Sequence, residues 1–162
     1  MAQEIERKFL VEGDAYRALA FDASRISQGY ISSGNGRTVR VRIRDDRGYL
    51  TIKGPSIDGG LSRYEFEIEI PLADARDLMA LCEAGTIEKT RYLVRAADEH
   101  VFEVDEFYGD NEGLVIAEVE LGSAGESFEK PAFIGREVTG DRRYYNAHLR
   151  RYPFRLWRSD NQ

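Results

Sequence analysis

Apolar and polar residues alternate along most of the chain. The pattern is clearest in residues 37–45, where Val39 and Val41 alternate with Arg40 and Arg42. A period of two residues is typical of a β-strand, because successive side chains point to opposite faces. Clusters of Gly, Asp, Asn or Pro separate the alternating segments and predict the turns between them. The pattern predicts eight strands, at residues 2–11, 25–32, 37–45, 48–53, 61–70, 86–96, 100–107 and 114–122.

A helical period appears at three places, residues 14–20, 72–84 and 142–151. The segment 72–84 fits best, because its apolar residues fall near one stripe and Gly85 follows as a stop signal. Many antiparallel strands with few helices indicate the α+β class, with a barrel or a strongly curved sheet. The 162 residues contain no internal repeat and no low-complexity linker, so we expect a single domain over residues 1–162.

Charged residues fall on one face of the predicted strands and apolar residues on the other. This pattern fits an apolar core with a solvated charged outside. It also fits a wide barrel whose charged faces line the inside while helices such as residues 72–84 cover the apolar outside. The two signs are segregated, with acids on the first, fifth and eighth strands and bases on the third, fourth and sixth. Because a merely soluble surface intersperses the two signs, we favour the charged interior.

Such an interior predicts a ligand that carries several linked phosphates. Carboxylates in one cavity can hold Mg²⁺ or Mn²⁺, and arginines and lysines opposite them can bind phosphate oxygens. The chain has no GxxxxGK[ST] loop and no GxGxxG after a strand, so side chains would bind the ligand in place of a backbone nest. We interpret His100 as a strand-end surface residue and His148 as a late-helix residue, which leaves serine or cysteine nucleophiles without a convincing base.

The composition narrows the function classes further. A net charge of -6 argues against a general nucleic-acid binder, which usually carries a basic excess. No apolar run is long enough to cross a bilayer, and the first residues have neither the basic end nor the apolar stretch of a signal peptide. We therefore expect a cytoplasmic protein with no membrane or nucleic-acid partner. The single cysteine, Cys82, excludes an internal disulfide and is expected to be a packing residue.

The charged motifs resemble, in order, those of the CYTH domain, whose members are called triphosphate tunnel metalloenzymes. The opening Glu4-x-Glu6-x-Lys8 is similar to the N-terminal signature of that family. The likeness continues through residues 28–30, 39–42, 51–53, 63–67, 88–92, 104–107, 118–121 and 137–144. The resemblance implies an eight-stranded antiparallel barrel or tunnel with a charged interior and helices packed outside. It also implies a divalent metal and a triphosphate substrate. The loop at residues 54–60 leaves open whether the barrel closes fully.

The resemblance and the charges together assign roles to individual residues. The cations expected to bind the substrate are Lys8, Arg40, Arg42, Lys53, Lys89, Arg91 and Arg143. A subset of the acids would hold one or two metal ions, and the candidates are Glu4, Glu6, Glu65, Glu67, Asp105, Glu118 and Glu120. Lys53, with Tyr30 near it, is the candidate general base for the attacking water, although a role in clamping phosphate fits Lys53 equally well.

The compact chain looks most like the bacterial inorganic triphosphatases of this family. The leading prediction is therefore hydrolysis of tripolyphosphate to pyrophosphate and phosphate. The enzyme alternatives are a triphosphatase for thiamine triphosphate or nucleoside triphosphates, and a class IV-type adenylyl cyclase. From other classes, a non-catalytic polyphosphate-binding module and a structural barrel without a ligand stay open. The expected partner is a small-molecule triphosphate, and the sequence is compatible with a homodimer.

Overall fold

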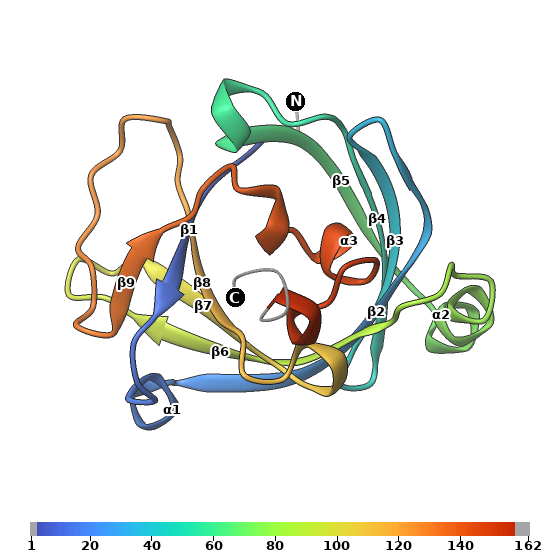
Figure 1. Ribbon diagram of the computed structural model, residues 1–162, viewed down its shortest axis with the longest axis horizontal. Helices are drawn as coiled ribbons and strands as arrows, with labels where there is room; N and C mark the ends of the chain where they lie inside the picture. Colours follow the sequence, from blue (N-terminus) through green and yellow to red (C-terminus); the bar gives the residue numbers. More distant parts are fainter. Residues whose placement is uncertain (1–2, 158–162) are drawn as a thin grey trace.

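Eight antiparallel strands close into a barrel in the computed structural model, which describes residues 3–157 (Figure 1). The strands are β1 (Gln3–Val11), β2 (Asp22–Gly34), β3 (Arg37–Arg44), β4 (Arg47–Lys53), β5 (Ser62–Ile70), β6 (Ile87–Arg95), β7 (Val101–Phe107) and β8 (Val115–Glu120). Their order around the ring is β5-β4-β3-β2-β6-β7-β8-β1, and β1 returns to β5. The eight predicted strands are confirmed, and β2 is longer at both ends than the pattern indicated.

Strand β1 closes the ring because it pairs along both of its edges. Residues 6–10 pair with β8 along one edge, and residues 3–5 pair with β5 along the other. The seam with β5 comes directly after the loop that connects β4 to β5, and Glu6 donates a backbone hydrogen bond to the Leu61 carbonyl (3.1 Å). Beyond this seam, the same edge of β1 pairs with a short strand that the sequence did not predict, β9 (Ile134–Glu137). The barrel is therefore closed, which answers the question that the loop at residues 54–60 left open.

The register of the strands places the charged faces inside the barrel. Residues directly opposite each other on antiparallel strands point to the same face. Lys8 lies opposite Glu118, Lys53 lies opposite Glu65, and Arg91 lies opposite Asp105. The outer face of β1, β7 and β8 carries a buried apolar cluster that includes Phe9, Phe102, Val104, Ala117 and Val119. The charged-interior arrangement is therefore confirmed.

Two helices cover the outside of the barrel (Figure 1). Helix α1 (Tyr16–Leu19) packs Tyr16 into the outer cluster. Helix α2 (Leu72–Met79) packs against β2, β3 and β4, and it approaches so closely that a Cβ added to Gly48 would lie 2.5 Å from the Ala75 Cβ. Helix α2 is shorter than predicted, because the chain turns after Met79 and places Cys82 against Gly29. This contact agrees with the expected packing role of Cys82.

The C-terminal segment differs from the prediction in both shape and position. In place of one helix over 142–151, it forms the 3₁₀ turn η3 (Arg142–Tyr144), helix α3 (Asn146–Leu149) and the 3₁₀ turn η4 (Phe154–Leu156). Tyr145 is extended (φ -75°, ψ 133°), which interrupts the helix. The segment lies inside the ring of strands (Figure 1). Helices were expected outside the barrel, and of the described helices this holds for α1 and α2 only. An apolar cluster anchors it there, formed by Ile87, Phe107, Leu114, Ile116, Val138, Tyr144, Leu149 and Trp157.

Candidate active site

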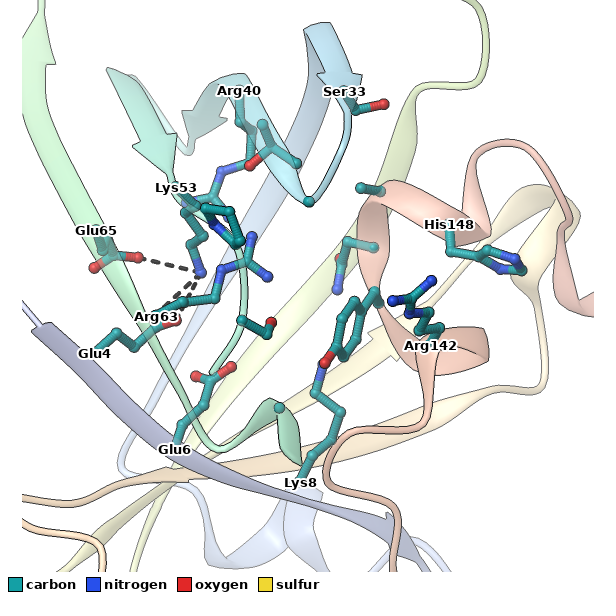
Figure 2. A pocket seen from close by; sticks show the side chains of 18 of the residues that line it. Glu4, Glu6, Lys8, Ser33, Arg40, Lys53, Arg63, Glu65, Arg142 and His148 are labelled. Carbon is teal, nitrogen blue, oxygen red and sulfur yellow. Dashed lines mark hydrogen bonds and ion pairs between the residues drawn. The ribbon is translucent and has the colours of Figure 1, made fainter. Parts of the chain in front are cut away.

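The barrel encloses a cavity of about 1090 Å³. Its walls come from all eight barrel strands, from the loop between β4 and β5, and from the C-terminal segment. Figure 2 shows side chains of both signs pointing into this space from opposite walls. The predicted site residues line the cavity, with the exception of Asp105 and Arg143.

One wall is acidic. Glu4 and Glu6 come from β1, Glu65 from β5 and Glu120 from β8. Burial raises the pKa of Glu4 and, more strongly, that of Glu6, and repulsion from neighbouring carboxylates adds to both shifts. The pKa of Glu120 is raised for the same two reasons. Burial and mutual repulsion therefore disfavour the ionised forms of these carboxylates.

Lys53 lies within the acidic wall, and not on the basic side of the cavity. Its ammonium nitrogen is 3.0 Å from Glu4 Oε1 and 3.2 Å from Glu65 Oε2 (Figure 2). The hydroxyl of Tyr30, by contrast, accepts a hydrogen bond from Gln28 (3.1 Å). Among the hydrogen bonds of residues 3–157, none joins Lys53 to Tyr30. The two residues predicted to act together are thus held by different partners.

The opposite wall is basic. Burial, together with repulsion from Arg40 and Arg91, lowers the pKa of Arg42 from 12.5 to about 9. Burial also lowers the pKa of Lys89 to about 7, and the attraction of Asp105 only partly opposes this shift. These two shifts show that the cations crowd one another without full compensation. An anion that enters the cavity would relieve the repulsion.

Besides Glu4 and Glu65, which pair with Lys53, three more of the predicted metal ligands are engaged by cations. Asp105 accepts bonds from Arg91 Nε (2.8 Å) and Nη2 (2.9 Å) and lies 2.7 Å from the Lys89 ammonium. Although burial opposes its ionisation, Arg91 and Lys89 hold the pKa of Asp105 below its usual value. Both carboxylate oxygens are occupied, so this geometry leaves Asp105 no free oxygen for a metal.

Glu67 and Glu118 are engaged in a similar way. Glu67 lies 3.5 Å from Arg40 and accepts a hydrogen bond from Thr51 (2.9 Å). Glu118 lies 3.5 Å from Lys8. Burial opposes the ionisation of Glu118, but Lys8 and then Arg91 hold its pKa well below the usual range. Both carboxylates still line the cavity and hold its cations in place.

Arg143 does not enter the cavity, which corrects its predicted role in substrate binding. Asp141 precedes η3 and accepts hydrogen bonds from Arg143 through the backbone nitrogen (3.1 Å) and Nη2 (2.7 Å). This pair turns Arg143 toward the surface, where it also contacts the Tyr144 and Trp157 rings. Successive side chains of a 3₁₀ turn point about 120° apart. The neighbouring Arg142 therefore lines the cavity in its place (Figure 2).

Sequence reasoning missed two amides beside the basic wall, the buried Gln28 and the partly buried Asn146. Gln28 bonds to Arg42, and Asn146 bonds to Lys89. A signal for Gln28 was available, since it is a polar residue at an inward position directly opposite Arg42. Asn146 carried none, because the C-terminal segment has neither the predicted helix nor the period of a strand.

The loop between β4 and β5 closes over the cavity next to the C-terminal segment. Its residues 55–61 line the cavity together with Gly140. A Cβ added to Gly60 would lie 2.5 Å from the Gly140 Cα, so the two backbones touch. Both glycines have positive φ angles, 92° at Gly60 and 82° at Gly140. Only glycine fits such an approach in this backbone conformation.

The acidic wall suits a divalent cation by its chemistry. Carboxylate oxygens are the ligands that Mg²⁺ and Mn²⁺ prefer. Burial, and then repulsion between carboxylates, raise the pKa values of Glu4, Glu6 and Glu120, so a bound cation would favour their ionised forms. Lys53 supplies a counter-charge between Glu4 and Glu65. Within residues 3–157, no three carboxylate, imidazole or thiol groups converge on one point as a ready-made metal site.

In the same part of the chain, no helix has the length and apolarity needed to span a membrane.

The fold and the cavity define a closed antiparallel barrel with a basic wall facing an acidic one. The profile of the CYTH domain matches residues 2–145, and the chain belongs to that family. It is 50% identical over 156 residues to the inorganic triphosphatase of Acetivibrio thermocellus, covering 96% of this chain and 97% of the relative. It is 37% identical to the inorganic triphosphatase of Nitrosomonas europaea, covering 90% and 95%.

Solved structures share the fold. The crystal structure of the inorganic triphosphatase NE1496 superposes with a TM-score of 0.62 at 33% identity, covering 92% of this chain and 95% of the other. The PH1012 protein of Pyrococcus horikoshii superposes with a TM-score of 0.61 at 19% identity, covering 75% and 80%. The second likeness concerns the fold alone.

Proposed function

We propose that this protein hydrolyses inorganic triphosphate to pyrophosphate and phosphate with the help of Mg²⁺ or Mn²⁺. The observation that carries the proposal is the division of the cavity into a crowded basic wall and a crowded acidic wall. Two relatives named inorganic triphosphatase, 50% and 37% identical in sequence to this chain, support the proposal. Phosphoryl transfer depends mainly on positioning and on neutralising charge, and such a cavity supplies both.

The basic wall would bind the triphosphate. Arg40, Arg42 and Arg91 can give forked, charge-assisted hydrogen bonds to phosphate oxygens, and Lys8 can give a point contact from β1. Arg42 is the best placed of the arginines, because its own bonds go to a neutral amide and leave its charge free. The reaction requires no covalent intermediate on the protein.

The acidic wall would hold the metal through Glu4, Glu6, Glu65 and Glu120. A bound divalent ion would neutralise charge on the phosphates during the reaction. Asp105 is better suited to holding Lys89 and Arg91, since both of its oxygens already bond to them.

The ion pairs of Lys89 and Lys53 favour the charged form of both lysines, which suits them to contact phosphate. Burial lowers the pKa of Lys89 to about 7, but its ammonium lies 2.7 Å from Asp105, and this ion pair opposes loss of the proton. Lys53, the base expected from the sequence, forms ion pairs with Glu4 and Glu65. Its position favours the alternative role, a counter-charge that can also contact a phosphate.

The cavity offers little to an organic substrate. Within the described residues, the aromatic side chains that line it are Tyr30, Tyr145 and His148, and the His148 ring already contacts Tyr152. The Tyr145 ring is already contacted by the Lys8 ammonium (4.9 Å) and the Arg63 guanidinium (5.9 Å). A nucleobase or thiazolium ring would have to displace these cations in order to stack. A bare polyphosphate needs no such surface, which favours the inorganic substrate.

A phosphate-release screen over tripolyphosphate, ATP and thiamine triphosphate, each with and without EDTA, tests the proposal. We expect release from tripolyphosphate with Mg²⁺ or Mn²⁺ and its loss in EDTA. Preferred turnover of ATP or thiamine triphosphate, or formation of cyclic AMP, would establish an alternative enzyme. Tight binding without any release would establish a binding module. The cytoplasmic location and the homodimer stay predictions.

A further inference from the structure

Gln28 is a fully buried glutamine that holds Arg42. Its side chain is 0% exposed. Its amide oxygen accepts two hydrogen bonds from the Arg42 guanidinium, from Nε (3.0 Å) and from Nη2 (2.9 Å). Because arginine can only donate, the oxygen must face Arg42 and the amide nitrogen must face away.

The amide nitrogen of Gln28 faces the C-terminal segment. It donates to Asn146 Oδ1 (3.2 Å), and the same oxygen accepts a bond from the Lys89 ammonium (2.9 Å). The amide orientations are consistent along the whole series, since each cation meets an oxygen. The series Arg42–Gln28–Asn146–Lys89 thus joins β3, β2, α3 and β6 through two neutral side chains.

The neutrality of these acceptors sets them apart from the other partners of the basic wall. Asp105 pairs with Arg91 and also with Lys89 (2.7 Å), Glu118 pairs with Lys8, and Glu67 pairs with Arg40. Within residues 3–157, no carboxylate lies within ion-pair distance of Arg42, whose hydrogen bonds go to Gln28. A carboxylate in place of Gln28 or Asn146 would orient the cation equally well, but it would also cancel the charge that attracts phosphate.

We propose that Gln28 and Asn146 are positioning residues for the substrate. Gln28 holds Arg42 in place without neutralising it, and Asn146 holds Gln28 and Lys89 in place without adding a second carboxylate to the one that Asp105 already gives Lys89. Through Asn146, the C-terminal segment becomes part of the phosphate site as well as a cover for one end of the barrel. This inference rests on the proposed function, because it takes a triphosphate as the anion that these cations bind.

Asn146→Asp is the discriminating variant. The introduced carboxylate would keep both accepted hydrogen bonds, so the fold should be retained with an unchanged or higher Tm. The added charge would compete with the phosphates for Lys89. We expect the Kd for tripolyphosphate, measured by calorimetry in EDTA, and the KM in Mg²⁺ to rise roughly tenfold to a hundredfold, as for the loss of a hydrogen bond to a charged group.

Asn111→Asp is the matched control. Asn111 is a buried asparagine that also contacts the C-terminal segment, through a hydrogen bond from the Phe154 backbone (2.8 Å), but it does not line the cavity. The Kd and KM of this variant should equal those of the wild type. Should Asn146→Asp prove unfolded, Gln28→Glu carries the same expectation, because it keeps an oxygen toward Arg42.

The readouts separate a positioning role from a purely structural one. If the amides only stabilise the fold, Asn146→Asp should bind tripolyphosphate like the wild type, and that result would overturn the proposal. Binding of tripolyphosphate by the wild type without turnover overturns the proposed reaction alone. Absence of binding by the wild type overturns both.

Discussion

Replacing Arg42 by alanine is expected to separate activity from stability. The guanidinium is buried, with 8% of the residue exposed, and it points into the cavity from β3. Its removal would delete a forked contact to phosphate that strengthens as charge develops. The loss should amount to about 2–4 kcal/mol in kcat/KM, which is roughly a thirtyfold to thousandfold decrease.

The cost in stability should be far smaller, because two effects offset each other. Leaving the Gln28 oxygen unsatisfied costs about 1–3 kcal/mol. The charged form of Arg42 is itself disfavoured in the folded state, since burial and the nearby Arg40 and Arg91 lower its pKa to about 9. Relief of this penalty opposes the loss, because alanine has no charge to bury. We therefore expect the midpoint of urea unfolding to change little.

Arg47→Ala is the control for this experiment. Arg47 begins β4, its side chain is 63% exposed, and it pairs with Glu69 at 3.4 Å. Exposed pairs of this kind contribute up to about 1 kcal/mol to stability. Kinetics with tripolyphosphate and urea unfolding should be measured for both variants. If Arg42→Ala and Arg47→Ala have the same kcat/KM, the arginines of β3 do not face the substrate and the reasoning is refuted.

Three further outcomes are expected. Glu4→Gln or Glu120→Gln should lower Mg²⁺-dependent phosphate release by at least about tenfold with little change in Tm, and activity that survives exhaustive chelation would contradict the metal assignment. Tripolyphosphate should show a far higher kcat/KM than ATP in the same assay, and equal values would favour a nucleotide substrate. Glu126 and Asp98 raise the pKa of His100 above 6.5, so its contribution to stability is present below pH 6.5 and is lost as the pH rises through the folded-state pKa. Urea unfolding of the wild type and His100→Gln should therefore differ more at pH 6 than at pH 8, and a pH-independent difference would argue against the His100 ion pairs.

The strands of the barrel could be predicted because each has one charged and one apolar face. A period of two identifies both the strand and the residues that share a face, as in β3, where Arg40 and Arg42 point inward together. Segregation of the two signs then distinguishes an interior cavity from a solvated surface. Most of the candidate site follows from these two patterns.

The C-terminal segment could not be predicted in the same way. Its apolar residues resemble a helical stripe, but they pack against the ends of strands inside the barrel, so tertiary packing decided its shape. Whether Arg142 or Arg143 enters the cavity depends on the hydrogen bonds from Arg143 to Asp141, which no periodicity reports. The short strand β9 contains Gly135, and it forms by pairing with β1, which is distant in sequence. A local sequence pattern therefore does not predict it.

The pairing of β1 also determines the order in which the protein can fold. Its partners β5, β8 and β9 all come later in the chain, and Lys8 donates its backbone hydrogen bond to Thr139, 131 residues away. Contacts of such long range form slowly, because the chain between them must first be ordered. Glu4, Glu6 and Lys8 are therefore synthesised first but reach their partners last. A nascent chain that lacks β8 and the C-terminal segment should have no working cavity, and the site should assemble only when the barrel closes.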